Sequence, residues 1–167
     1  MRVLGLVAAA GGGVDRRLRV EVAEPAVARG WRLAVTFTPT AGRWMDAVGE
    51  TARLQALTDL PVRSTSRLPS EPKPYPIPDA FLFVPATANS LAKLALGIAD
   101  NQALTALGEA LGTSGVPIVI RPQADAAQRA HPRWASHVDT LIGAGVHIAD
   151  GAATDPWEPL LDVLEGL

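Results

Sequence analysis

The sequence AFLFVPATANSLAK at residues 80–93 joins an unbroken apolar run to a segment with helical periodicity. The run Ala80–Val84 does not alternate apolar and polar residues, which is typical of a strand buried on both faces of a parallel sheet. The segment Ala88–Ile98 places its apolar residues on one face of a helix, at Leu91, Leu94, Ala95 and Ile98. A buried strand that leads directly into a helix is one half of a βαβ unit.

The same alternation continues on both sides of this stretch. Before it, the pattern predicts strands and helices at Val3–Val7, Arg16–Arg29, Leu33–Phe37 and Ala41–Thr58, and a short strand at Pro61–Ser64. After it, the pattern predicts elements at Asn101–Leu111, Val116–Ile120, Ala124–Ala130, Trp134–Gly143, Val146–Ile148 and Pro156–Glu165. Strands separated by helices predict an α/β fold with a parallel sheet, in a single domain over residues 1–167.

The composition narrows the classes of function. With 167 residues, 48% of them hydrophobic, the chain is long enough to bury a core. It has no Cys, which excludes disulfides and thiolate chemistry, and its three His lack a metal-binding spacing, so we expect no metal. A net charge of −2 argues against a nucleic-acid partner, and no apolar stretch approaches the roughly 18 residues of a membrane span. We expect a cytoplasmic protein without a targeting segment.

Three predicted strand ends carry small or hydroxyl-bearing residues and lead into helices, at Ala8–Gly13, Thr38–Ala41 and Pro85–Ser90. Ligands of parallel α/β sheets bind beyond the carboxyl ends of the strands. Backbone N–H groups at helix starts bind phosphate, and small residues let the ligand approach closely. The sequence therefore predicts a phosphorylated cofactor at this edge of the sheet.

The segment Leu68–Pro78 contains five of the fourteen Pro residues and cannot form a regular helix or a central strand. Two interpretations are open. It is either a surface connection or a loop that lies over a ligand site, because long loops on rigid scaffolds often carry function.

Three short motifs carry a family resemblance. They are PATANS at Pro85–Ser90, GIADN at Gly97–Asn101 and TPTA at Thr38–Ala41. In this order and spacing they resemble the flavin-dependent cysteine decarboxylase superfamily, which includes phosphopantothenoylcysteine decarboxylases and the peptidyl-cysteine decarboxylases of lantibiotic biosynthesis. Within that superfamily the chain is most similar to short actinobacterial flavoproteins. The resemblance implies a Rossmann-like three-layer sandwich with flavodoxin-like strand order.

The same resemblance implies bound FMN. It places the phosphate-side turn at Ala9, Gly11 and Gly12 and a second turn at Thr38. Arg121 falls where the related flavin prenyltransferases carry an Arg near phosphate, and an Arg can hold a phosphate through two parallel hydrogen bonds. The flavin-contacting turn falls on Pro85, Ala86, Thr87, Ala88, Asn89 and Ser90.

Two substrate-side elements of the superfamily are altered. The position of the catalytic His aligns with Glu71, and the signature PxMNxxMW aligns with Pro122–Arg129, where only the Pro is kept. The Asn of that signature is Asp125, whose charge would repel a substrate carboxylate. Standard oxidative decarboxylation of cysteine is therefore not expected. The candidates for substrate contact or catalysis are Glu71, Asp125 and His131.

Three functions are compatible with this pattern. The first is an FMN-dependent oxidoreductase that acts on an unknown small-molecule or peptide substrate. The second is a non-catalytic flavin-binding or partner subunit, and the third is a divergent flavin-dependent decarboxylase. The resemblance also implies a homo-oligomer, either a trimer or a multiple of trimers.

Overall fold

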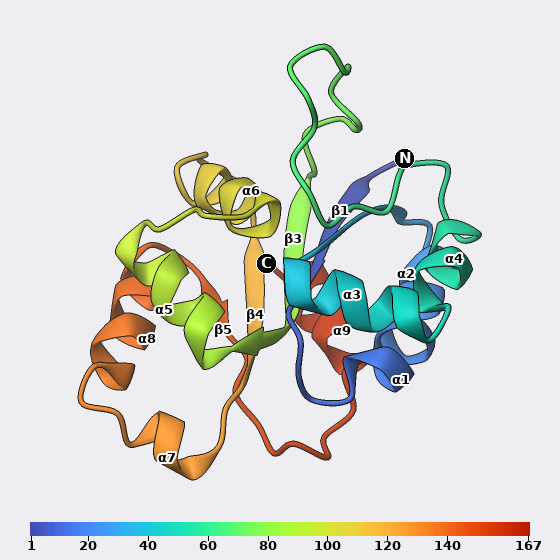
Figure 1. Cartoon of the computed structure of the whole chain (residues 1–167). Helices are drawn as coiled ribbons and strands as arrows, with labels where there is room; N and C mark the ends of the chain where they lie inside the picture. The colour runs from blue at the N-terminus through green and yellow to red at the C-terminus, as the bar shows by residue number, and fades with distance from the viewer.

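A computed structural model describes residues 1–167 and contains one parallel sheet of five strands in the order β2-β1-β3-β4-β5 (Figure 1). This order confirms the predicted α/β fold of Rossmann-like, flavodoxin-like type. All three central strands are almost completely buried, as their unbroken apolar runs predicted. The strands are β1 (Val3–Ala8), β2 (Arg32–Phe37), β3 (Ala80–Thr87), β4 (Ile118–Gln123) and β5 (His147–Ile148).

Helices cover the sheet on both sides and complete the three layers (Figure 1). One layer contains α5 (Ala88–Leu96), α6 (Gln102–Leu111) and α8 (Trp134–Gly143), with the short α7 (Ala126–Arg129) beside it. The other layer contains α1 (Val14–Leu18), η1 (Arg19–Ala23), α2 (Glu24–Ala28), α3 (Pro39–Ala47), α4 (Glu50–Gln55) and α9 (Pro159–Glu165). No helix in the structure has the length and apolar character needed to cross a membrane.

The first helical segment runs from Val14 to Ala28 and contains a π-helical turn, η1, in the middle. Here the N–H of Glu24 donates to the carbonyl of Arg19, five residues earlier. Pro25 follows directly and has no N–H to donate, so it occupies the first turn of α2, where that group is not needed. The predicted helix Arg16–Arg29 therefore accommodates Pro25 without a break.

Two predicted elements between β2 and β3 are wrong. The single helix expected at Ala41–Thr58 is two helices, because Gly49 adopts a left-handed φ of 75° between α3 and α4. The strand expected at Pro61–Ser64 is only one parallel bridge between Arg63 and Thr36.

The connection after this bridge, which includes Leu68–Pro78, projects beyond the edge of the sheet where β1 begins (green in Figure 1). It returns to the sheet at Asp79, whose carboxylate accepts from the N–H of Val3 at 2.7 Å. The segment therefore does not lie over the carboxyl ends of the strands, where the sequence predicts the cofactor.

Candidate functional site

The carboxyl ends of β1, β2 and β3 meet at a surface pocket of about 390 Å³. Five predicted cofactor residues line it, namely Ala9, Thr38, Thr87, Asn89 and Ser90. Gly11 adjoins the pocket, because a Cβ added at Gly11 would lie 3.6 Å from the Cγ2 atom of Thr87. The structure thus brings together three chain segments that are separated by about 30 to 50 residues in the sequence.

Hydroxyl side chains build the two helix starts at this pocket. Thr87 caps α5, since its Oγ1 accepts from the N–H of Ser90 at 3.2 Å and lies 3.2 Å from the Ser90 hydroxyl. Thr38 caps α3 in the same way through the N–H of Ala41. The exposed side-chain amide of Asn89 has no hydrogen-bond partner in the protein, so it is free to bind a ligand.

The loop after β1 provides unused backbone donors. The N–H groups of Ala10, Gly11, Gly12 and Gly13 donate to no acceptor in the protein, whereas the N–H of Ala9 donates to the Pro85 carbonyl at 2.9 Å. Gly12 and Gly13 adopt positive φ values of 59° and 74°, which side chains with a Cβ rarely reach. Free N–H groups in such a loop, placed just before α1, fit an anion such as phosphate without a Ser hydroxyl.

Four polar residues of the pocket were not among the predicted cofactor residues, namely Thr40, Lys93, Asp100 and Asn101. Lys93 forms an ion pair with Asp100 at 2.6 Å, and Asn101 caps α6 through the N–H of Leu104. The GIADN motif contains both Asp100 and Asn101, so the sequence signal was present. What the sequence did not show is that this motif lies beside the strand ends.

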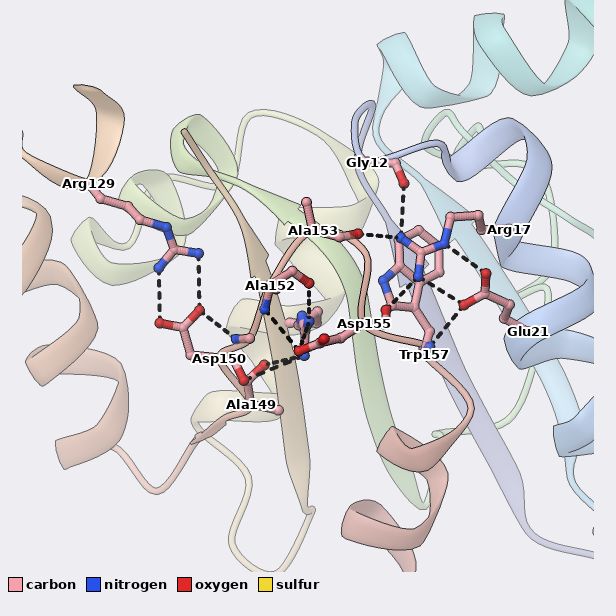
Figure 2. A network of polar contacts seen from close by, with 12 residues as sticks. Gly12, Arg17, Glu21, Arg129, Ala149, Asp150, Ala152, Ala153, Asp155 and Trp157 are labelled. Atoms are coloured by element: carbon pink, nitrogen blue, oxygen red, sulfur yellow. Dashed lines mark hydrogen bonds and ion pairs between the residues drawn. The ribbon is translucent and has the colours of Figure 1, made fainter. Parts of the chain in front are cut away.

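Arg121 does not line this pocket. The predicted strand Val116–Ile120 is β4 at Ile118–Gln123, so Arg121 lies within the strand instead of just beyond it. Its guanidinium is buried and donates to the carbonyls of Ala149 and Ala152, at 3.3 and 2.8 Å (Figure 2). Its observed role is therefore to hold the loop after β5, while Nε has no partner in the protein.

Two further arginines hold the same loop (Figure 2). Arg17 donates to the carbonyls of Ala153 and Asp155 and stacks on the ring of Trp157, with 4.0 Å between the guanidinium carbon and the ring centroid. Arg129 makes two hydrogen bonds to the carboxylate of Asp150. Burial alone would raise the pKa of Asp150, but Arg129, the Gly151 N–H and the charge of Arg121 together outweigh it, so the pKa is lowered.

The three candidate catalytic residues lie apart from the pocket and from one another. Glu71 accepts from the N–H of Leu68 at 2.7 Å in the projecting loop. Asp125 caps α7 and forms a reciprocal capping box with Gln128. His131 is exposed, and its Nδ1 accepts from the N–H of Arg133 at 3.1 Å. All three side chains thus form local turn contacts, and their catalytic roles stay predictions.

The chain matches one protein family and, over part of its length, one curated protein. Residues 30–166 match the Flavoprotein family. A cysteine/cysteine sulfinic acid decarboxylase from an unknown prokaryotic organism is 38% identical over 72 residues, which are 43% of this chain and 19% of that protein. The chain therefore spans less than a fifth of the length of this curated relative.

Solved structures show the same fold along nearly the whole chain. The FMN-dependent cysteine decarboxylase TvaF from thioviridamide biosynthesis has a TM-score of 0.74 at 21% identity, over 99% of this chain and 97% of the other. The FMN-dependent cysteine decarboxylase SpaF has a TM-score of 0.60 at 26% identity, over 90% and 83% of the two chains.

The chain belongs to the Flavoprotein family, within the superfamily of proteins similar to flavin-dependent cysteine decarboxylases. The resemblance seen in the three sequence motifs is thereby confirmed. A flavin is the cofactor class that this family implies, and the pocket at the strand ends has the donors to hold its phosphate.

Proposed function

We propose that the chain binds FMN at the carboxyl ends of β1, β2 and β3 and that it takes part in the oxidation or reduction of a small molecule. The observation that carries this proposal is the pocket in which Thr38, Thr87 and Asn89 meet next to a loop of unused N–H groups. The amides of Ala10 to Gly13 would hold the phosphate. The free amide of Asn89 would contact the flavin ring or its tail.

When bound, the flavin would supply the electron chemistry, because it can accept and return a pair of electrons. This chain would orient it and exclude water from one side. The caps made by Thr38 and Thr87 fix the two helix starts, so the donors around the flavin are rigid.

The absorption spectrum of the purified protein tests FMN binding directly. We expect a yellow protein, or a colourless one that takes up one FMN per chain. Asn89→Asp should raise the dissociation constant for FMN about tenfold, because an acidic group would replace a free amide beside an anionic cofactor. Ser114→Asp adds the same charge on an exposed loop and should leave FMN binding unchanged. Failure of the wild-type protein to bind FMN would contradict the proposal.

A second candidate function is a non-catalytic flavin-binding or partner subunit. It is favoured by one observation, which is that no His lines the pocket and that Glu71, Asp125 and His131 lie outside it. Anaerobic mixing of the FMN-loaded protein with cysteine-ended peptides separates the possibilities. Bleaching of the flavin would support a divergent decarboxylase, as the related FMN-dependent cysteine decarboxylases suggest.

We also propose that the protein is a homo-oligomer, a trimer or a multiple of trimers. Several apolar side chains are exposed on the helices that border the pocket, at Trp44, Val48 and Leu96. A second copy would cover such side chains. Light scattering coupled to gel filtration should give a mass of three chains or a multiple of it, and a monomer would contradict this proposal.

A further inference from the structure

A second cavity, of about 350 Å³, lies between the sheet, α6 and the projecting Pro-rich loop. Its volume is within the range of small-molecule sites. The sheet contributes the middle of β1 and β2, on the side where α6 packs against β2. Tyr75 closes the cavity from the loop side, because its hydroxyl lies 2.5 Å from Oγ1 of the buried Thr36.

The cavity concentrates positively charged side chains that form no ion pair. Seven of the fifteen Lys and Arg side chains form no ion pair, and three of these seven line this one cavity. They are Arg63, Arg67 and Lys73. The only carboxylate in the lining is that of Glu109 on α6. Since the whole chain carries a net charge of −2, this local excess of cations indicates a site for an anion.

The floor of the cavity is flat and apolar. Gly5 lies between Ala34 on β2 and Phe81 on β3 in the sheet register. A Cβ at Gly5 would lie 2.5 Å from the ring of Phe81, so the absence of a side chain lets this ring extend over β1. The guanidinium carbon of Arg63 lies 6.0 Å from the centroid of the Tyr75 ring. Such a floor fits a ring or a short apolar chain, with cations along one side.

The cavity and the pocket at the strand ends lie along the same face of the sheet, and they share no lining residue. Gly5 of the cavity is on β1, and Ala9 of the pocket follows the end of β1, about 13 Å further along at 3.3 Å per residue. Thr36 of the cavity is on β2, and Thr38 of the pocket follows the end of β2. Asn101, just before α6, lines the pocket, and Gln102, at the start of α6, lines the cavity. The direction from the cavity to the pocket is therefore along the strands, toward their carboxyl ends.

We infer that the cavity binds the anionic end of the molecule on which the flavin acts. The substrate would be a small anionic compound with an apolar body, whose carboxylate or phosphate is held by Arg63, Arg67 and Lys73. Its body would lie on the floor formed by Gly5 and Phe81, and its reacting end would reach the strand-end pocket. This inference rests on the proposed function, and it assigns the substrate a charge and a direction of binding.

The experiment compares two rigid probes of the same shape, biphenyl-4-carboxylate and the neutral biphenyl-4-carboxamide. Calorimetry measures their binding to the FMN-loaded protein, and visible absorption follows the flavin. We expect the carboxylate to bind at least ten times more tightly than the amide and to shift the flavin bands at saturation. The double variant Arg67→Gln, Lys73→Gln should lose this preference. Arg133→Gln, which removes an exposed cation outside the cavity, should keep it.

Equal affinity for the two probes, a preference that survives in the double variant, or an unchanged flavin spectrum at saturation would each overturn the inference. The FMN-free protein provides a separate readout by calorimetry. Failure to bind FMN contradicts the proposed function, whereas loss of the charge preference in a protein that does bind FMN contradicts only the inference about the cavity. Because both substituted side chains of the double variant are exposed, its folding should match that of the wild type.

Discussion

The hydroxyl oxygens of Thr36 on β2 and Tyr75 in the Pro-rich loop lie 2.5 Å apart, and this contact attaches the loop to the sheet. Thr36 is only 2% exposed, so its hydroxyl depends on Tyr75 for a partner at that place. Five Pro residues stiffen the loop on either side of the contact. This hydrogen bond and the packing of Tyr75 against Val3, Ala34 and Leu60 together hold the loop that forms one wall of the second cavity.

Removing the hydroxyl of Tyr75 should release the loop. In Tyr75→Phe the buried Thr36 hydroxyl loses its partner, and we expect the free energy of unfolding to fall by about 1–3 kcal/mol. Limited proteolysis within residues 66–78 should become several times faster. In the double variant Thr36→Val, Tyr75→Phe no polar group is left unpaired, so part of the stability should return. A cleavage rate equal to that of the wild type would show that the contact does not hold the loop.

The close approach of β1 to Phe81 gives a second test. Gly5→Ala places a Cβ 2.5 Å from the Phe81 ring in the centre of the sheet. This steric clash can be relieved only if the ring moves. We expect a loss of about 1–3 kcal/mol in the free energy of unfolding, measured by urea denaturation. Gly108→Ala is the control, because a Cβ there meets nothing within 4 Å and α6 should gain stability. Equal stability of the two variants would contradict the described packing.

Glu50 makes stability depend on acid pH. Its carboxylate joins α4 to η1 through Arg19 at 2.9 Å and also pairs with Arg53 at 2.6 Å. Burial alone would raise the pKa of Glu50, but the two guanidinium groups outweigh it and the pKa lies below the usual value of 4.5. The ionised carboxylate therefore adds stability above pH 4.5, and this contribution is lost as the pH falls through the lowered pKa.

Thermal unfolding between pH 3 and pH 7 measures this contribution. We expect Glu50→Gln to be less stable than the wild type at pH 7 and to approach it in acid, since the wild type loses its advantage there. Glu158→Gln, at a mostly exposed position, should follow the wild-type curve. A constant difference between the Glu50→Gln variant and the wild type at all pH values would show that ionisation of Glu50 is not responsible.

Arg121 has an observed role in holding the loop after β5, and the family resemblance implies a second role in binding phosphate. One substitution can separate these two roles. Arg121→Lys keeps the charge, but one ammonium group cannot replace the hydrogen bonds to the carbonyls of Ala149 and Ala152. We expect a lower melting temperature and faster proteolysis of residues 149–157, with FMN affinity nearly unchanged. Arg129→Lys affects only the more exposed pair with Asp150 and should have a smaller effect. A large loss of FMN affinity without loss of stability would instead support the phosphate contact implied by the family resemblance.

The sequence by itself determined the class of fold, and it predicted where the cofactor turns lie. Unbroken apolar runs such as Phe81–Val84 occur where both faces of a strand are covered, and this requires helices on both sides of a parallel sheet. The capping residues Thr38 and Thr87 act within three residues of their own position, so their roles can be predicted locally. The motif at Pro85–Ser90 indicated a flavin turn through its resemblance to the family.

Only the tertiary structure decided the contacts between residues that lie far apart in the sequence. The guanidinium of Arg121 lies on carbonyls about 30 residues further along. The strand begins two residues and ends three residues later than predicted, so Arg121 lies within it and is buried under the loop after β5. The projecting loop leaves Glu71 away from the strand ends, although its alignment with the family's catalytic His suggested a role there. The cluster of Arg63, Arg67 and Lys73 beside Gly5 arises from packing between segments that share no local pattern, and no periodicity could have predicted it.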